Sequence, residues 1–206
     1  MKIFDISMAI YPGMMVYKNK TEKQPALKVV KDDPKGIVET RLYLDTHTGT
    51  HVDAPGHVFP GGPGVESIAP ADFFTFCRVL DLTGVPEKIS RRDLLAHAIQ
   101  PGDFLLLKTK NSWNENFAFD FVYLSAEAAA YLADLGVRGV GLDALGIERD
   151  QPGYPTHRTL LAKKILLIEG LRLKEVPAGV YFLIVAPLKL TGVEAAPARV
   201  LLFGPG

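Results

Sequence analysis

Three of the protein's five histidines and an aspartate fall within the segment 47–57, which reads His-Thr-Gly-Thr-His-Val-Asp-Ala-Pro-Gly-His. Neutral imidazole and carboxylate are side chains that hold zinc, iron or manganese at neutral pH. Glycine and threonine separate His47 from His51, and a Pro-Gly pair follows, so the composition disfavours a helix. A pair of histidines four residues apart carries little weight alone, but a third histidine and an aspartate nearby indicate a metal site.

The chain just before this segment, residues 37–45, alternates and is rich in β-branched and aromatic residues, as a β-strand should be. If the extended path continues, positions 47, 49, 51 and 53 point to one side. His47, His51 and Asp53 would then share a face with Gly49, whose missing side chain leaves room for an ion. The last histidine of the segment would lie beyond a Pro-Gly turn, close to these residues but off the strand.

Two residues in the second half of the chain could complete such a site. His157 stands at the start of a short helical segment, and the preceding Thr156 is a candidate cap. Glu169 ends the apolar run 165–168, and a carboxylate at the end of a buried strand is costly unless it is paired or binds a metal. From the residues alone, a helix-start histidine and a surface carboxylate remain open alternatives.

The segment 47–57 resembles the His-x-Gly-Thr-His-x-Asp-x-Pro-x-His signature of the cyclase-like metal-dependent hydrolases, a family that includes bacterial kynurenine formamidases (arylformamidases) and isatin hydrolases. All signature positions are met, at His47, Gly49, Thr50, His51, Asp53, Pro55 and His57. Further similarity runs from residues 5–7 to residues 187–190. The resemblance implies a hydrolase with two divalent metal ions, with zinc as the first choice and manganese as the alternative.

The resemblance also implies a role for each candidate ligand. His47 and His51 would bind one metal ion, and Asp53 would bridge both ions. His157 would bind the second ion, and Glu169 would lie at or between the two. Two such ions can hold and acidify a water molecule that then attacks a carbonyl carbon.

Two residues are implied to act on the substrate. His57, the histidine of the signature that is not a ligand, would be the general acid/base, because imidazole titrates near neutrality. Tyr17 stands where the formamidases carry an aromatic residue that packs on the substrate ring. Those enzymes show a Trp-Pro-Gly-Asp-like run there, whereas this chain reads Tyr-Lys-Asn-Lys over 17–20. This difference bears on the identity of the substrate and does not affect the expected metal chemistry.

The periodicities predict a mixed α/β fold with parallel and antiparallel strand pairing. Strands are expected at 3–7, 37–45, 77–82, 104–108, 137–142, 165–168, 180–185 and 199–203, and helices at 90–98 and 126–135. Ser90 and Ser125 are expected to cap the helices, and Leu94 and Leu95 to face inward. Asp143 is expected to serve a turn or a helix cap. The resemblance implies the three-layer swivelling β/β/α arrangement in one domain, residues 1–206.

Composition limits the classes of function. A chain of 206 residues is long enough for one sizeable core. Acidic and basic residues balance at 23 each, which argues against nucleic acid or an anionic membrane as a partner. One cysteine, Cys77, cannot form an internal disulfide, the N-terminus lacks an apolar signal core, and the longest apolar run, 180–187, is too short to cross a bilayer. We therefore expect a soluble, cytoplasmic protein.

The leading hypothesis is a binuclear metal-dependent hydrolase that cleaves a small aryl amide, with N-formylkynurenine converted to kynurenine and formate in tryptophan catabolism. A ring-opening hydrolase of isatin, a lactam or a lactone uses the same chemistry, and the sequence does not separate the two. The rival from another class is a non-catalytic metal- or ligand-binding module, which would have no use for a non-ligating histidine at position 57. The resemblance also implies a homodimer or a higher homo-oligomer.

Overall fold

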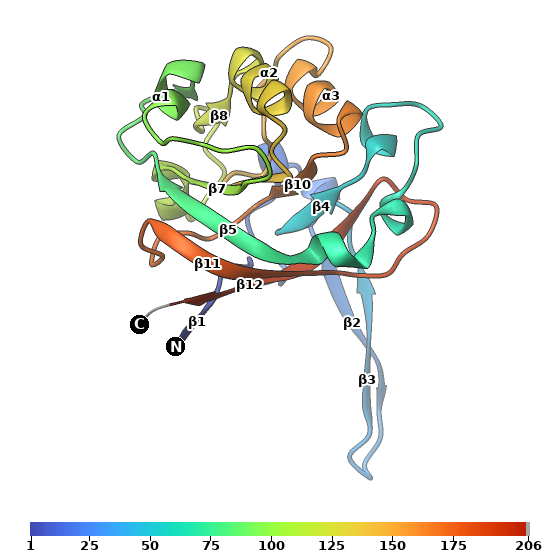
Figure 1. Cartoon of the computed structure of the whole chain (residues 1–206). Helices are drawn as coiled ribbons and strands as arrows, with labels where there is room; N and C mark the ends of the chain where they lie inside the picture. The colour runs from blue at the N-terminus through green and yellow to red at the C-terminus, as the bar shows by residue number, and fades with distance from the viewer. Residues whose placement is uncertain (205–206) are drawn as a thin grey trace.

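An eight-stranded mixed sheet forms the centre of the computed structural model, which describes residues 1–204 (Figure 1). Its strands are β1 (Lys2–Asp5), β4 (His51–Asp53), β5 (Phe74–Asp81), β7 (Phe104–Lys108), β9 (Gly139–Leu142), β10 (Leu166–Glu169), β11 (Gly179–Pro187) and β12 (Ala195–Gly204). The order is β1-β12-β11-β5-β7-β9-β10-β4, and β4 also pairs with β12, so the sheet closes on itself. Strands β5, β7, β9 and β10 are parallel to one another, and the other pairings are antiparallel. The predicted mixed α/β fold is confirmed.

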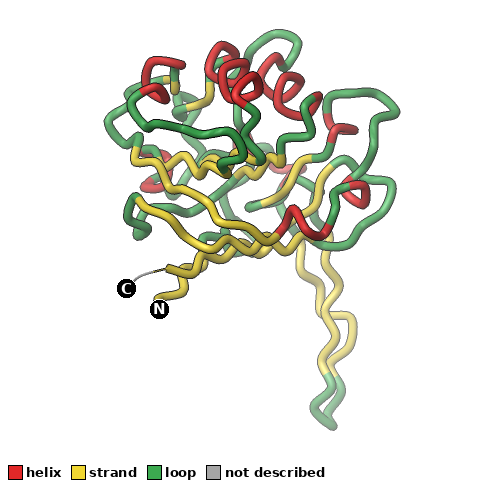
Figure 2. Tube along the Cα trace, in the orientation of Figure 1, coloured by secondary structure: helices red, strands yellow, loops and turns green. Residues whose placement is uncertain are grey.

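Three α-helices lie together on one side of this sheet (Figures 1 and 2). They are α1 (Arg91–Leu95), α2 (Ala126–Leu135) and α3 (Pro155–Ala162), beside the short parallel pair β6 (Lys88–Ile89) and β8 (Tyr123–Leu124). Short 3-10 helices occur at Tyr17–Asn19, Thr21–Lys23, Pro55–His57, Val65–Ser67, Pro70–Phe73 and Lys110–Trp113. Ser90 and Ser125 cap α1 and α2 as expected. Helix α1 is shorter than predicted, and because it ends at Leu95 that side chain is exposed rather than inward.

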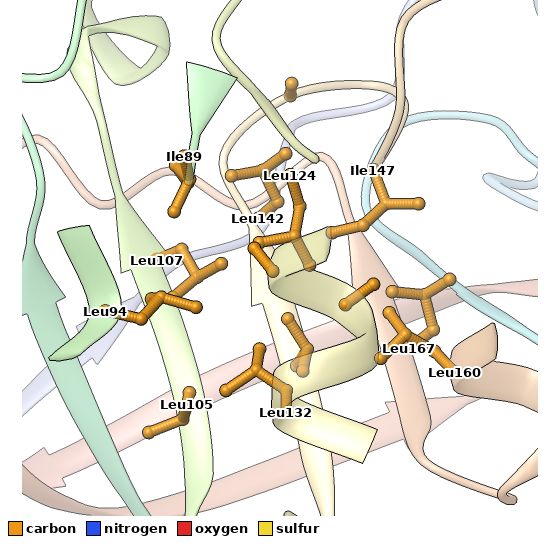
Figure 3. Close-up of a cluster of buried hydrophobic side chains, with 14 of the residues drawn as sticks. Ile89, Leu94, Leu105, Leu107, Leu124, Leu132, Leu142, Ile147, Leu160 and Leu167 are labelled. Atoms are coloured by element: carbon orange, nitrogen blue, oxygen red, sulfur yellow. The ribbon is translucent and has the colours of Figure 1, made fainter. Parts of the chain in front are cut away.

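The core has two main parts because the central strands are buried on both faces. Leu105 and Leu107 of β7 belong to the cluster under the helices, together with Leu132 of α2 and Leu160 of α3 (Figure 3). The alternate residue Leu106 points into the second cluster, inside the closed sheet. This alternation follows from the two-residue period of a strand, and it makes β7 apolar throughout.

Strands β2 (Ala26–Asp32) and β3 (Val38–Tyr43) form a separate antiparallel hairpin that projects from the body of the molecule (Figure 1). All their residues are exposed. The predicted strand 37–45 therefore exists as β3, whereas β2 is not among the strands predicted from the sequence. Strand β2 reads Ala-Leu-Lys-Val-Val-Lys-Asp, and this mixture of lysines and valines suits an exposed strand as well as a loop.

The prediction of one extended path through residues 47–53 is wrong. The chain turns between β3 and β4, and Gly49 has a φ of +64°, in the left-handed region. The turn is required because β4 enters the closed sheet between β10 and β12, whereas β3 pairs only with β2. No helix within residues 1–204 is long and apolar enough to cross a membrane.

Candidate metal centre

Two neighbouring antiparallel strands hold three of the five predicted ligands. His51 and Asp53 lie on the same face of β4, since side chains alternate along a strand, and the intervening Val52 is buried in the core. Glu169, at the end of β10, pairs in register with His51. Nε2 of His51 lies 3.3 Å from Oε2 of Glu169 and 3.5 Å from Oδ1 of Asp53.

His47 reaches the same place from the turn before β4 rather than from a strand. Its Nδ1 atom lies 3.1 Å from Oδ1 of Asp53. The turn is fixed by Thr50, whose hydroxyl donates to the carbonyl oxygen of Gly170 at 2.6 Å and accepts from the amide of Met8 at 2.8 Å. Thr50 therefore ties the turn to the residue that follows Glu169.

His157 comes from the first turn of α3. Its Nε2 atom lies 3.1 Å from Oε1 of Glu169 and 3.7 Å from Oδ2 of Asp53. The expected cap by Thr156 is wrong, because the N-cap position is Tyr154 and Thr156 lies inside the helix. The amides of Thr156 and His157 instead donate to the carboxylate of Glu148, at 3.1 and 3.2 Å.

Each of these histidines has one ring nitrogen held by a further partner. Nδ1 of His157 contacts Glu148, Nε2 of His47 lies 3.3 Å from Glu194, and Nδ1 of His51 lies 2.9 Å from the carbonyl oxygen of Gly49. The other nitrogen of each ring then faces Asp53. Partners of this kind orient metal-ligating histidines and set their basicity. Sequence reasoning missed Glu148 and Glu194, because both lie in loops without a recognisable motif.

Buried polar atoms without a hydrogen-bond partner gather at this centre. Among residues 1–204 they are Thr48 Oγ1, His51 Nε2, Asp53 Oδ1 and Asp53 Oδ2. Asp53 is only 1% exposed. A buried carboxylate that accepts no hydrogen bond is costly unless a charge compensates it. A cation placed between Asp53 and the histidines would satisfy the oxygens of Asp53 and Nε2 of His51, so the donor set fits a metal.

The histidines and carboxylates of the cluster shift one another's pKa values. Burial alone would lower the pKa of His51 and of His157, but contacts with Glu169 and, for His157, Glu148 outweigh it and raise the pKa values to about 9 and about 10. Burial would raise the pKa of Glu169, but the same histidines hold it well below its usual range. Without metal, protons on these histidines therefore neutralise the buried carboxylates.

His57 lies in the 3-10 helix Pro55–His57, half-buried beside the cluster. Its ring centre is 4.4 Å from that of His47 and 5.2 Å from that of His157. Burial lowers the pKa of His57, and the neighbouring imidazoles lower it further. Single atoms of His47, Asp53 and His57 lie within 4.8 Å of one another, as do those of His51, Asp53 and Glu169. The geometry therefore suits His57 as a ligand as well as an acid/base.

A cavity of about 600 Å³ opens onto the cluster. Tyr17 lines it together with the loop residues 145–146, 148 and 150–154, so this predicted substrate-binding residue does share the space with the candidate ligands. The Tyr17 ring is half-buried and packs edge-on against Phe117 at 5.2 Å between ring centres. Asp143 lies outside this cavity and accepts hydrogen bonds from Thr109 and Ser112, so it anchors the distant segment around the 3-10 helix Lys110–Trp113 and not a turn of its own.

Comparison with known proteins agrees with this fold. The Cyclase family model matches residues 4–149. A kynurenine formamidase of Salinibacter ruber is 34% identical over 211 residues, covering 98% of this chain and 97% of that protein. A solved structure described as a potential metal-dependent hydrolase with cyclase activity is 51% identical, with a TM-score of 0.94 over 100% of this chain and 98% of the other. Isatin hydrolase A from Ralstonia solanacearum, 23% identical with a TM-score of 0.83 over 98% and 91% of the two chains, shares the fold.

The closed mixed sheet and its buried histidine–carboxylate cluster, taken with these relatives, define the class as metal-dependent hydrolases. The chain belongs to the Cyclase family.

Proposed function

We propose that this protein hydrolyses a small aryl amide with two divalent cations bound at the cluster, and that N-formylkynurenine, cleaved to kynurenine and formate, is the substrate. The observation that carries the proposal is the pair of unsatisfied, buried oxygens of Asp53 facing three histidines. The similarity to a kynurenine formamidase supports this choice of substrate.

The two oxygens of Asp53 face different histidines, as do those of Glu169, which supports two ions in place of one. Oδ1 of Asp53 faces His47 and His51, whereas Oδ2 faces His157. Glu169 divides in the same way, with Oε2 toward His51 and Oε1 toward His157. His47 and His51 would hold one ion and His157 the other, with both carboxylates between them. Zinc suits this mixed set of nitrogen and oxygen ligands, and manganese is the alternative.

When bound, the ions would supply an acidified water and a Lewis acid for the substrate carbonyl. His57 is placed on the cavity side of the cluster, where it takes up a proton from the attacking water and returns it to the departing nitrogen. Its lowered pKa keeps the imidazole neutral at pH 7, as the first of these steps requires. Tyr17 provides a flat wall for the aryl group.

Replacing His57 separates the acid/base role from a ligand role. His57→Ala should lower turnover of N-formylkynurenine about 100- to 10,000-fold, the usual contribution of general acid–base catalysis, and should leave the bound metal unchanged. His97→Ala is the matched control, because His97 lies outside the cavity. Loss of metal from His57→Ala would make His57 a ligand instead. Turnover of isatin without turnover of N-formylkynurenine would move the assignment to ring opening.

We propose further that the protein is a homodimer or higher oligomer and works in the cytoplasm. A two-stranded hairpin alone in water is marginally stable, yet β2 and β3 project with their apolar residues uncovered. Those residues are Leu27, Val29, Val30, Val38, Leu42 and Tyr43, and Ile37 in the connecting turn is exposed as well. A second copy would cover this surface. A free, buried Cys77 suits a reducing compartment.

A further inference from the structure

Three lysines line the same cavity as the histidine–carboxylate cluster. Lys18, Lys20 and Lys23 come from the consecutive 3-10 helices Tyr17–Asn19 and Thr21–Lys23. Their side chains are 34%, 49% and 32% exposed, whereas Glu169 is buried. The lysines therefore stand at the open end of the cavity and the metal cluster at its closed end.

Of the carboxylates paired with these lysines, only that of Asp150, the partner of Lys18, lines the cavity. Lys20 lies 3.7 Å from Glu22 and Lys23 lies 2.9 Å from Asp45, but neither acid lines the cavity. Each ammonium group has three donors, so one partner leaves donors free for a ligand. Exposed ion pairs are also weak, and a ligand carboxylate can replace a partner at little cost.

Lys18 forms an ion pair with an acid that also lines the cavity. Its ammonium lies 2.6 Å from Asp150, on the loop that also carries Tyr154. Lys18, Asp150 and Tyr154 all line the cavity. They are three of the six non-glycine residues with positive φ among residues 1–204. Such backbone strain is found at ligand-binding segments, where the surrounding structure maintains it.

The acids that face the closed end are already engaged. Glu148 and Glu169 are buried, and both contact His157. The cavity thus has a carboxylate-and-histidine end suited to a metal-held carbonyl and a lysine end suited to an anion. Lys18 and Lys20 also fall in the 17–20 run where the sequence departs from the formamidase pattern.

We infer that Lys18, Lys20 and Lys23 determine specificity by binding a carboxylate of the substrate, at the end remote from the bond that is cleaved. The inference rests on the proposed hydrolase function and narrows its substrate class to aryl carbonyl compounds that carry an acidic group. N-formylkynurenine, with its amino-acid carboxylate, belongs to that class. A neutral lactam such as isatin does not.

The test compares kcat/KM for N-formylkynurenine and for its neutral α-carboxamide, using the metal-loaded enzyme. The triple variant Lys18→Gln, Lys20→Gln, Lys23→Gln should lose a preference for the acid of about tenfold or more, mainly through KM, since hydrogen bonds between charged groups are worth at least this much. The matched control is Lys31→Gln, a lysine 44% exposed and paired with Glu39 on the hairpin. The triple arginine variant should keep the preference.

An equal preference in the wild type and the triple glutamine variant, or none in the wild type, overturns the inference. If the wild type hydrolyses neither compound, the proposed function has failed. The lysine site is then tested by calorimetry, which compares the binding of 2-aminobenzoate with that of 2-aminobenzamide. Tighter binding of the acid that disappears only in the triple glutamine variant supports the lysine site. Equal loss in the Lys31→Gln control, or no difference between the two ligands, overturns it.

Discussion

At the scale of single residues, the partners behind the histidines matter as much as the histidines. Glu148 contacts Nδ1 of His157 and accepts hydrogen bonds from the amides of Thr156 and His157 at the start of α3. Glu148 is 4% exposed, so its contacts are shielded from water. This residue fixes where Nε2 of His157 points.

Replacing Glu148 should therefore weaken metal binding without touching a ligand. For Glu148→Gln we expect metal affinity to fall about 10- to 100-fold, the usual effect of losing an outer partner. Titration against a chromophoric chelator measures it, with Glu127→Gln on the exposed face of α2 as the control. Unchanged affinity in a folded Glu148→Gln protein would contradict the positioning role.

Metal uptake should release protons at pH 7. The pKa values of about 9 for His51 and about 10 for His157 mean that both rings are protonated in the metal-free protein. A cation must displace those protons, so affinity should rise with pH from 7 toward 9. Calorimetry in two buffers of different ionisation enthalpy should count at least two protons per protein, one from each ring, with any further proton coming from the metal-bound water. No proton release would contradict these pKa shifts.

The raised pKa values of His51 and His157 also determine how the stability of the metal-free protein changes with pH. A histidine whose pKa is raised by folding stabilises the fold fully below its unfolded pKa of about 6.5. That contribution is lost as pH rises through 9 and 10, the folded values of His51 and His157. Metal-free protein should accordingly melt at a lower temperature at pH 10 than at pH 7.

At the scale of elements, the site depends on how β4 closes the sheet. Strand β4 lies between β10 and β12, and the turn before it touches the residue after β10. Gly170 makes this contact close: its φ is +70°, and a Cβ atom there would lie 2.5 Å from the carbonyl oxygen of Gly49. A side chain at Gly170 would push the turn carrying His47 away from Glu169.

Gly170→Ala should destabilise the protein by more than the cost of the backbone conformation alone. Gly136→Ala is the control, because Gly136 has a similar φ of +80° with nothing within 4 Å of a new Cβ. The control should cost about 1–2 kcal/mol in free energy of unfolding. Gly170→Ala should lower the free energy of unfolding by several kcal/mol, because the overpacking against Gly49 adds to the cost of the backbone conformation. It should also weaken metal binding. Equal costs in urea denaturation would show that the contact with Gly49 is unimportant.

At the scale of the whole molecule, the projecting hairpin predicts self-association. Leu27 and Leu42 face each other across β2 and β3, and both are exposed. The double variant Leu27→Lys, Leu42→Lys should sediment as a monomer where the wild type forms a dimer or a larger oligomer, because burying two lysines costs more than the interface provides. A wild-type monomer at micromolar concentration would remove this role for the hairpin.

The sequence predicted most of the sheet and the residues of the cluster, and the misses have physical causes. Alternation and apolar runs identified strands such as β7 and β10, since buried strands carry strong local signals. The turn at Gly49 was missed because its cause is the distant pairing of β4 with β10 and β12. Glu148 and Glu194 were missed because their roles arise only from tertiary contacts with His157 and His47.

The most direct test of the account is hydrolysis of N-formylkynurenine after the protein is stripped of metal and reloaded with zinc or manganese. The proposed centre predicts two bound ions per chain, no turnover in the stripped protein and recovery on reloading. Two bound ions without turnover would keep the metal centre and direct the search to lactams and lactones. A folded protein that binds neither zinc nor manganese would contradict the metal centre and the function built on it.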